Sequence, residues 1–278
     1  MVISLHQNMN LFVDAHVHIK NGDGIASILS AGIAAVRDAG LRDRSWSTAS
    51  GDVHLHAMPV IISAERALYK KNGYGSRLGT AVDRQDEIKA EILKLKEAGA
   101  GIIKVIASGL VSLSEPGRIT PGGFNREELA FIVREADSHG LSVMAHANGE
   151  AAIVAAAEAG VLSVEHGFYM TGHALDVMAK QGTFWTPTVG ALARAADVKT
   201  ISDVMKASLS ELIQSHLAMI GRAWKMGIPL AIGTDCVLPD PVYRSIYDAE
   251  LSYFEQAGIS REDILKIACE GGAKLLGI

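Results

Sequence analysis

The sequence predicts a (β/α)8 barrel, in which eight parallel strands are each followed by a helix. The length of 278 residues is close to the roughly 250 residues that such a barrel needs. Apolar residues make up 49% of the chain, which is enough for one large core. Short apolar runs alternate with helix-like segments along the chain, as expected of a parallel sheet that is covered on both faces.

Eight apolar runs rich in Val, Ile and Leu are the predicted strands. They are residues 11–16, 34–37, 58–63, 102–107, 142–145, 162–165, 183–187 and 229–233. Five segments with helical periodicity end in glycine: residues 86–99, 126–140, 150–160, 172–182 and 209–227. Each closing glycine predicts a left-handed helix end that leads into the next strand. Asn125, with Glu128 three residues later, predicts a capped helix start. No linker divides the chain, so we expect one domain over residues 1–278 without a separate β-sandwich.

The composition excludes several classes of partner. A net charge of −5 without dense runs of Lys or Arg argues against nucleic-acid binding and against a membrane surface. Residues 1–10 do not have the pattern of a secretion signal, and no run approaches the roughly 18 apolar residues of a membrane span. Cys236 and Cys269 are too few for a disulfide framework, which fits a reducing cytosol. We expect a cytoplasmic protein that acts on a small molecule. The sequence leaves open whether the protein forms a homo-oligomer.

Two histidines close the first predicted strand. His16 and His18 are two residues apart, so their imidazoles share one face of the strand, about 7 Å apart, where they can bind one ion. Such a pair also occurs at strand edges without a metal. His54 and His56 have the same spacing but precede a strand, so we interpret them as structural residues on the opposite, stability-determining face.

Polar residues that suit a metal also stand at four other strand ends, where a packed barrel interior favours Val or Ile. They are Lys104, His146, His166 and Asp235. Burying imidazoles, an ammonium and a carboxylate near one axis is strongly unfavourable if they are unpaired, and a metal centre removes that penalty. Each residue alone has an ordinary alternative, as a satisfied core histidine or a buried lysine paired with an aspartate. Their shared position at strand ends favours a metal centre.

The ordered set of His-x-His, Lys, His, His and Asp resembles the amidohydrolase superfamily over nearly the whole chain. The sequence motifs are most similar to those of the binuclear-metal branch, which contains Xaa-Pro dipeptidases and imidazolonepropionase-like amidohydrolases. The stretches that carry the resemblance are residues 35–40, 103–109, 165–167, 233–235 and 273–277.

The resemblance implies two divalent metal ions, usually zinc. It also implies that carbon dioxide carbamylates Lys104, giving a carboxylated lysine that bridges them. His16 and His18 with Asp235 would bind the first ion, and His146 with His166 the second. A bare ammonium cannot bind a cation, so Lys104 needs this modification or the loss of its proton. Relatives usually carry a small β-sandwich built from both chain ends, but only fifteen residues precede His16 here.

The resemblance further implies a hydrolase that cleaves the amide C–N bond of a small substrate, such as a dipeptide or an N-acyl amino acid, with a metal-activated hydroxide. Asp235 would carry the proton from the attacking water to the leaving nitrogen, or else serve purely as a ligand. Lactone hydrolysis stays open. A mononuclear deaminase is disfavoured because Gly149 stands where those members have a glutamate. An idle metal-binding or small-molecule-binding barrel is disfavoured because Lys104 and Asp235 are both present.

The predicted substrate contacts rest on weaker signals. Asn148 stands where many relatives have a second histidine, and its amide can donate to a carbonyl or carboxylate. Residues 70–80 and 109–124 are predicted loops after strands three and four, on the active-site face. Further residues near strand-following loops that could line the pocket are Tyr69, Arg118, Tyr169 and Thr188.

Overall fold

The structure of the protein, a computed structural model, describes residues 11–46, 58–198 and 200–278. The strands of this part of the chain are β1 (Phe12–Ile19), β2 (Ile33–Asp38), β3 (Val60–Ser63), β4 (Ala67–Lys70), β5 (Gly79–Val82), β6 (Ile102–Ile106), β7 (Ser142–Ala147), β8 (Ser163–His166), β9 (Phe184–Thr186) and β10 (Cys236–Leu238). They form two sheets, ordered β10-β1-β2-β3 and β5-β4-β6-β7-β8-β9. Every pairing between these strands is parallel, as predicted.

The first seam between the two sheets is crossed by one bent strand. β3 pairs with β2 and β4 pairs with β6, although only residues 64–66 separate β3 from β4. Glu65 has a left-handed φ of 58°, which turns the chain at this bend. The backbone N–H of Gly101 also donates to the carbonyl of Ser63 at 2.9 Å. β3 and β4 therefore act together as the third strand of one barrel.

The second seam is filled by residues 229–233, the last predicted strand. These residues form a single bridge to β9 rather than a regular strand. The N–H of Trp185 donates to Pro229 at 2.9 Å, and the N–H of Ala15 donates to Ile232 at 2.7 Å. Because this segment hydrogen-bonds both β9 and β1, the strands surround a common interior. The predicted (β/α)8 barrel is confirmed.

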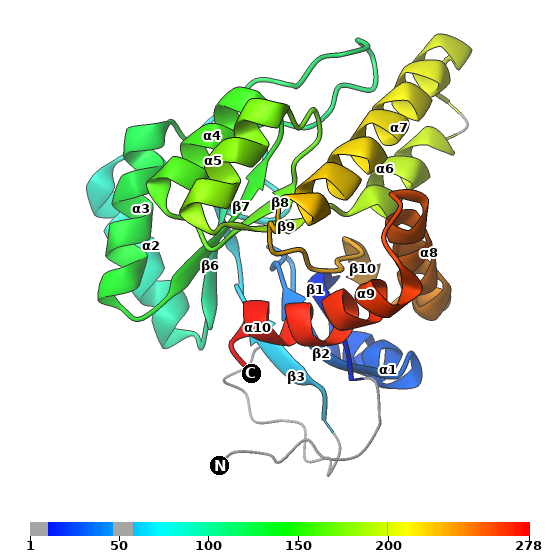
Figure 1. Cartoon of the computed structure of the whole chain (residues 1–278). Coiled ribbons are helices and arrows are strands. Elements are labelled where there is room, and N and C mark those ends of the chain that lie inside the picture. The colour runs from blue at the N-terminus through cyan, green and yellow to red at the C-terminus, as the bar shows by residue number, and fades with distance from the viewer. Residues whose placement is uncertain (1–10, 47–57, 199) are drawn as a thin grey trace.

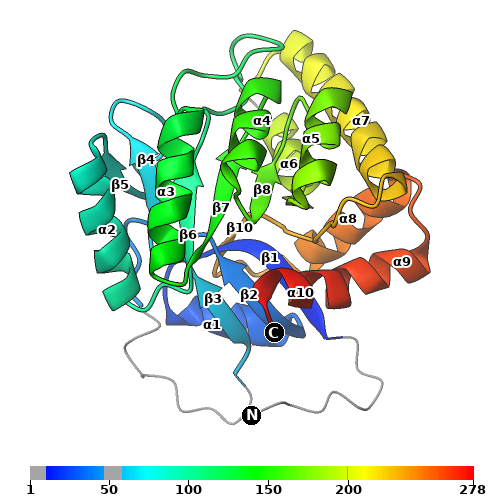
Figure 2. The same cartoon turned by 60° about the vertical axis from the view of Figure 1, so that its left-hand side comes forward.

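The helices lie outside the strands. They are α1 (Gly22–Ser30), α2 (Gln85–Glu97), α3 (Arg126–Ser138), α4 (Glu150–Ala159), α5 (Gly172–Gln181), α6 (Val189–Ala196), α7 (Asp203–Lys225), α8 (Tyr243–Gln256), α9 (Arg261–Lys266), a π-helical turn (Ile267–Gly271) and α10 (Gly272–Leu276). Figure 1 shows α2 to α5 along the outer side of β6 to β9, and Figure 2 shows the same layer from another side. None of the helices in the described residues has the length and apolar character needed to cross a membrane.

Local sequence signals account for most helix ends. Asn125 caps α3, accepting from the N–H of Glu128 while the Glu128 carboxylate accepts from the N–H of Asn125, as predicted. Gly160 and Gly182 end α4 and α5 in the left-handed conformation, again as predicted. α7 begins at Asp203, six residues before the predicted start. Only half of residues 203–208 are apolar, and Val204 among them is exposed, so periodicity does not reveal this first turn.

The amino-terminal end of the barrel is closed by apolar packing. Leu275 of α10 belongs to one buried cluster with Ala15, Phe184 and Ala231. Gly272 lies so close to β1 that an added Cβ would stand 2.5 Å from the Cβ of Val13. The carboxyl ends of the strands are therefore left as the place for a pocket. The histidine pair at positions 54 and 56, predicted to be structural, lies outside the described residues.

Candidate metal centre

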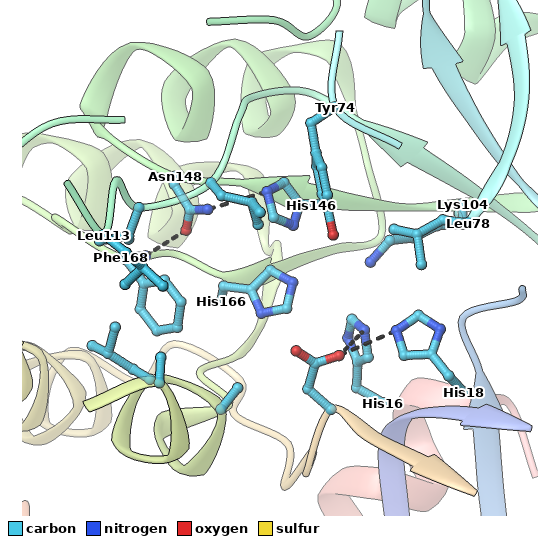
Figure 3. Close-up of a pocket in the computed structure, with 16 residues that line it drawn as sticks. His16, His18, Tyr74, Leu78, Lys104, Leu113, His146, Asn148, His166 and Phe168 are labelled. Carbon is cyan, nitrogen blue, oxygen red and sulfur yellow. Dashed lines mark hydrogen bonds and ion pairs between the residues drawn. The ribbon is translucent and has the colours of Figure 1, made fainter. Parts of the chain in front are cut away.

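Six sequence-predicted residues meet in one cavity toward the carboxyl ends of the strands (Figure 3). The cavity has a volume of about 180 Å³. The first two, His16 and His18, come from β1. The others are Lys104 from β6, His146 from β7, His166 from β8 and Asp235, which directly precedes β10. Strand ends that are far apart in the sequence thus supply one common site.

The potential ligand atoms lie close together. Oδ1 of Asp235 is 3.1 Å from Nε2 of His18 and 3.4 Å from Nε2 of His16. The ligand atoms of these three residues all lie within 4.8 Å of one another. The ring centroids of His146 and His166 are 4.6 Å apart, and His166 is 5.1 Å from His16. Imidazole and carboxylate groups at this spacing suit a divalent ion such as zinc.

The two histidines of β1 are each held from behind through one ring nitrogen. Nδ1 of His18 donates to the carbonyl of Gly40 at 2.6 Å, since a carbonyl oxygen only accepts. Nδ1 of His16 lies 2.7 Å from Oε2 of Glu165 and donates to that carboxylate. Each ring therefore keeps its Nε2 for the cavity, which is the usual arrangement behind a metal-binding histidine.

The other two histidines are held in the same way by different nitrogens. Nε2 of His146 donates to the carbonyl of Gly109 at 3.0 Å, so Nδ1 is left for the cavity. Nδ1 of His166 is hydrogen-bonded to the hydroxyl of Thr188 at 2.7 Å, so Nε2 is left. Thr188, predicted to line the pocket, instead orients a histidine.

Burial keeps two of these imidazoles neutral. Burial, together with the charge of Lys104, lowers the pKa of His16 to about 4 and the pKa of His146 to about 3. A neutral imidazole has the free lone pair that a metal ion requires. His16 and His146 are therefore ready to bind a cation near neutral pH without first losing a proton, whereas the neighbouring Asp235 raises the pKa of His18.

Lys104 is the residue whose environment most needs explanation. It is almost completely buried, and its Nζ has no hydrogen-bond partner among the residues that the structure describes. Burial lowers the pKa of Lys104 to about 8, with Glu165 and Asp235 opposing and Arg37 adding to the shift. A buried ammonium without a partner is unfavourable, so the site fits a lysine that is neutral or covalently modified.

A charged layer beneath the histidines was not predicted from the sequence. Arg37 donates to Oε1 of Glu165 at 2.7 Å and to the hydroxyl of Ser163 at 2.9 Å. Burial alone would raise the pKa of Glu165, but Arg37 and the hydrogen bond from His16 hold it well below its usual range. The carboxylate stays ionised and orients His16. The sequence does carry a signal, since Arg37 and Glu165 are charged residues inside apolar runs.

Tyr74 is a second residue that the sequence analysis missed. It comes from the segment between β4 and β5, and its ring centroid lies 5.3 Å from that of His146. Figure 3 shows its hydroxyl directed into the cavity between His146 and Lys104. Burial, followed by the charge of Asp235, raises the pKa of Tyr74 to about 12, so the hydroxyl keeps its proton and can donate.

Asn148 lines the cavity, but both ends of its amide are engaged by the protein. Its Oδ1 accepts from the N–H of Phe168 at 3.0 Å, and its Nδ2 donates to the carbonyl of Gly109 at 3.3 Å. The same Nδ2 lies 3.1 Å from Nε2 of His146. The side chain thus ties three segments of the cavity wall together.

The two tyrosines predicted as substrate contacts lie outside the cavity lining. Tyr69 is in β4, where it is buried against Ala67 and Ile106. Tyr169 is partly buried and packs against a small cluster around Leu192. The sequence placed both near loops, but the bend at β3 and β4 makes Tyr69 part of a strand. Tyr74 occupies the cavity instead.

Glu150 does not take the place of a deaminase glutamate. It is the first residue of α4, and its carboxylate accepts from the hydroxyl of Thr171 rather than facing the cavity. Gly149, directly before it, has a φ of 79° and precedes the helix as its cap. Neither residue therefore places a glutamate carboxylate in the described cavity lining.

The fold and the site together define an α/β barrel with a histidine-rich centre at the carboxyl ends of its strands. The chain belongs to the amidohydrolase family, whose model matches residues 12–278. This confirms the resemblance that the strand-end motifs suggested.

Individual relatives are more distant. Ochratoxinase from Aspergillus niger is 28% identical over 227 residues, which cover 81% of this chain and 46% of that protein. The chain thus spans about half the length of this curated relative. Among solved structures, a Xaa-Pro dipeptidase with bound methionine has a TM-score of 0.77 at 22% identity, with 96% of this chain and 75% of that one covered. The A. niger ochratoxinase structure has a TM-score of 0.78 at 24% identity, and the match covers 95% of this chain and 71% of that one.

Proposed function

We propose that this protein is a metal-dependent hydrolase that cleaves the amide C–N bond of a small substrate, such as a dipeptide or an N-acyl amino acid. The observation that carries the proposal is the convergence of four histidines, Asp235 and a buried, unpaired Lys104 on one cavity. A dipeptidase among the structural neighbours supports it, since a peptide bond is an amide.

The donor set allows two divalent ions, which we expect to be zinc. His16 and His18 with Asp235 would hold one ion, and His146 with His166 the other. Lys104, once carbamylated, would offer a carboxylate to both, which explains why its Nζ lacks a partner among the described residues. Bound divalent ions would acidify a water molecule and polarise the carbonyl of the substrate.

The protein's own residues then move the proton. Attack of water on the carbonyl carbon forms a C–O bond, and the C–N bond breaks to give a carboxylic acid and an amine. The carboxylate of Asp235 takes a proton from the water and gives it to the leaving nitrogen. Oδ1 of Asp235 lies 3.1 Å from Nε2 of His18, so the carboxylate stands next to the nitrogen that His18 keeps for the cavity.

Tyr74 is placed to donate a hydrogen bond to the carbonyl oxygen as negative charge develops there. We expect Tyr74→Phe to lower kcat/KM by about 100-fold, because one donor to an oxyanion is lost. Steady-state kinetics on a cleaved amide would measure this. Tyr69→Phe is the matched control, since Tyr69 packs outside the cavity. Equal losses in the two variants, or no loss in Tyr74→Phe, would contradict the role.

The function itself is tested by metal analysis of the purified protein together with a hydrolysis screen. The screen contains Xaa-Pro dipeptides, N-acyl amino acids, uncharged N-acyl amines and lactones. We expect two ions per chain and turnover of at least one amide class. Two ions without turnover of any class would instead indicate a binding protein, and turnover of lactones alone would indicate a lactonase.

A further inference from the structure

The cavity has two chemically different halves. In Figure 3, His16, His18 and Lys104 lie on one side of the cavity, and Leu113 and Phe168 lie on the other side, beyond His146 and His166. The inner half, with the histidines, Lys104 and Asp235, is polar. The outer half is apolar and is formed mainly by the segment after β6, by Phe168 and by α6. Its principal side chains are Leu110, Val111, Leu113, Phe168, Leu192 and Ala195.

The apolar half has a firm inner wall and an open rim. Phe168 and Leu192 are buried and belong to one cluster with Met205 and Leu209 of α7. The buried carboxyl group of Glu250 accepts from two backbone N–H groups at the start of α6, each at 2.8 Å, and so fixes the helix that carries Leu192. The wall is therefore supported from behind by packing and by hydrogen bonds.

The rim, by contrast, exposes apolar side chains to water. Leu110 is 41% exposed and Leu113 is 43% exposed, and both line the cavity. A ligand that covers them removes apolar surface from water, which favours binding. A cavity that admitted only charged or strongly hydrated groups would not need apolar side chains at its rim. The rim thus favours an apolar group.

The described residues of the outer half also provide no charged partner for a carboxylate. Among the described residues that line the cavity, Lys104 is the sole Lys or Arg, and it lies in the inner half with the histidines. Arg194 of α6 donates through Nη2 to the backbone carbonyl of Thr234 at 2.8 Å. The amide of Asn148 is also engaged on both sides. A carboxylate in this half would lose its hydration without gaining a charged hydrogen-bond donor.

Building on the proposed hydrolase function, we propose that the site is specific for amides that carry an apolar, uncharged substituent next to the scissile bond, and that it discriminates against a free carboxylate at that place. The substrate class narrows to uncharged N-acyl amines and to peptides or N-acyl amino acids whose carboxyl group is blocked. Free dipeptides and free N-acyl amino acids become the poorer substrates.

A matched pair of substrates tests this specificity. N-acetyl-2-phenylethylamine and N-acetylphenylalanine share the acetyl amide and the phenyl ring, and only the second carries a carboxylate. With the metal-loaded protein we expect kcat/KM to be at least about tenfold higher for the uncharged amide. Calorimetric binding of both compounds to the metal-loaded Asp235→Asn variant should show the same order of affinity without cleavage.

A charge introduced at the rim gives the second arm of the test. Leu113→Arg supplies the cation that the described residues of the outer half lack, and we expect it to reduce the preference for the uncharged amide about tenfold. Leu93→Arg is the control, because Leu93 lies on α2 outside the cavity lining and is 46% exposed. It should leave the ratio unchanged.

The outcomes separate this inference from the proposed function. If N-acetylphenylalanine is cleaved as well as the uncharged amide or better, the specificity is wrong while the amide hydrolase stands. If neither compound is cleaved and the uncharged one binds more tightly, amide hydrolysis of this class is rejected but the apolar subsite stands. Equal binding of the two compounds, or binding of neither, overturns the subsite.

Discussion

Replacement of Asp235 by asparagine is expected to lower kcat by about 10³-fold, because the amide cannot accept the proton of the attacking water. Asparagine keeps the size of the side chain and an oxygen near Nε2 of His18, where Oδ1 of Asp235 lies at 3.1 Å. We therefore expect the variant to fold and to retain at least part of its metal. Steady-state kinetics and metal analysis on the same preparation would measure both effects.

The control for this substitution is Asp176→Asn, since Asp176 is exposed on α5. Turnover should be unchanged there. Loss of turnover in Asp235→Asn with metal retained supports the proton shuttle. Loss of turnover together with loss of metal would reduce Asp235 to a ligand, and unchanged turnover would exclude both roles.

Lys104→Ala should lower the metal content from two ions per chain to one or fewer. The physical reason is that a carbamylated Lys104 would give one carboxylate to both ions, and alanine removes it. Lys104→Met is the companion variant, because methionine fills the space of the lysine stem without its charge. Metal analysis of both variants measures the effect, and carbon-13 NMR of protein held in labelled bicarbonate would detect the carbamate directly.

Lys94→Ala is the control for the lysine series, since Lys94 is exposed on α2. It should bind metal as the unmodified chain does. Because Nζ of Lys104 is buried without a partner among the described residues, Lys104→Met should not destabilise the metal-free protein. Unchanged metal stoichiometry in both Lys104 variants would remove the bridging role.

The order of the elements could be predicted from the sequence because it depends on local patterns. Apolar runs, closing glycines and the Asn125 cap act within a few residues of each other. The same patterns do not reveal strands that form only by pairing. β4 and β5 are four residues long and hydrogen-bond to each other, and β4 also pairs with β6. For that reason a predicted loop contained the ends of two strands, and Tyr69 was expected in the pocket in place of Tyr74.

Strand alternation was also an incomplete guide within β1. Asp14, His16 and His18 are two residues apart and would share one face of a regular strand. The register of β1 against β2 shifts between Asp14 and Val17. Asp14 consequently accepts from the hydroxyls of Thr234 and Tyr243, outside the group of predicted ligands. The irregularity separates a structural carboxylate from the histidines.

The sequence by itself determined the barrel and the six residues at its centre, because the carboxyl ends of parallel strands meet at one end of a barrel wherever they stand in the chain. Only the tertiary structure decided how those residues are used. The nitrogen that each histidine keeps for the cavity depends on distant partners such as Glu165 for His16 and Thr188 for His166. The unpaired Nζ of Lys104 and the apolar outer half likewise arise from contacts between separate elements, which no local pattern encodes.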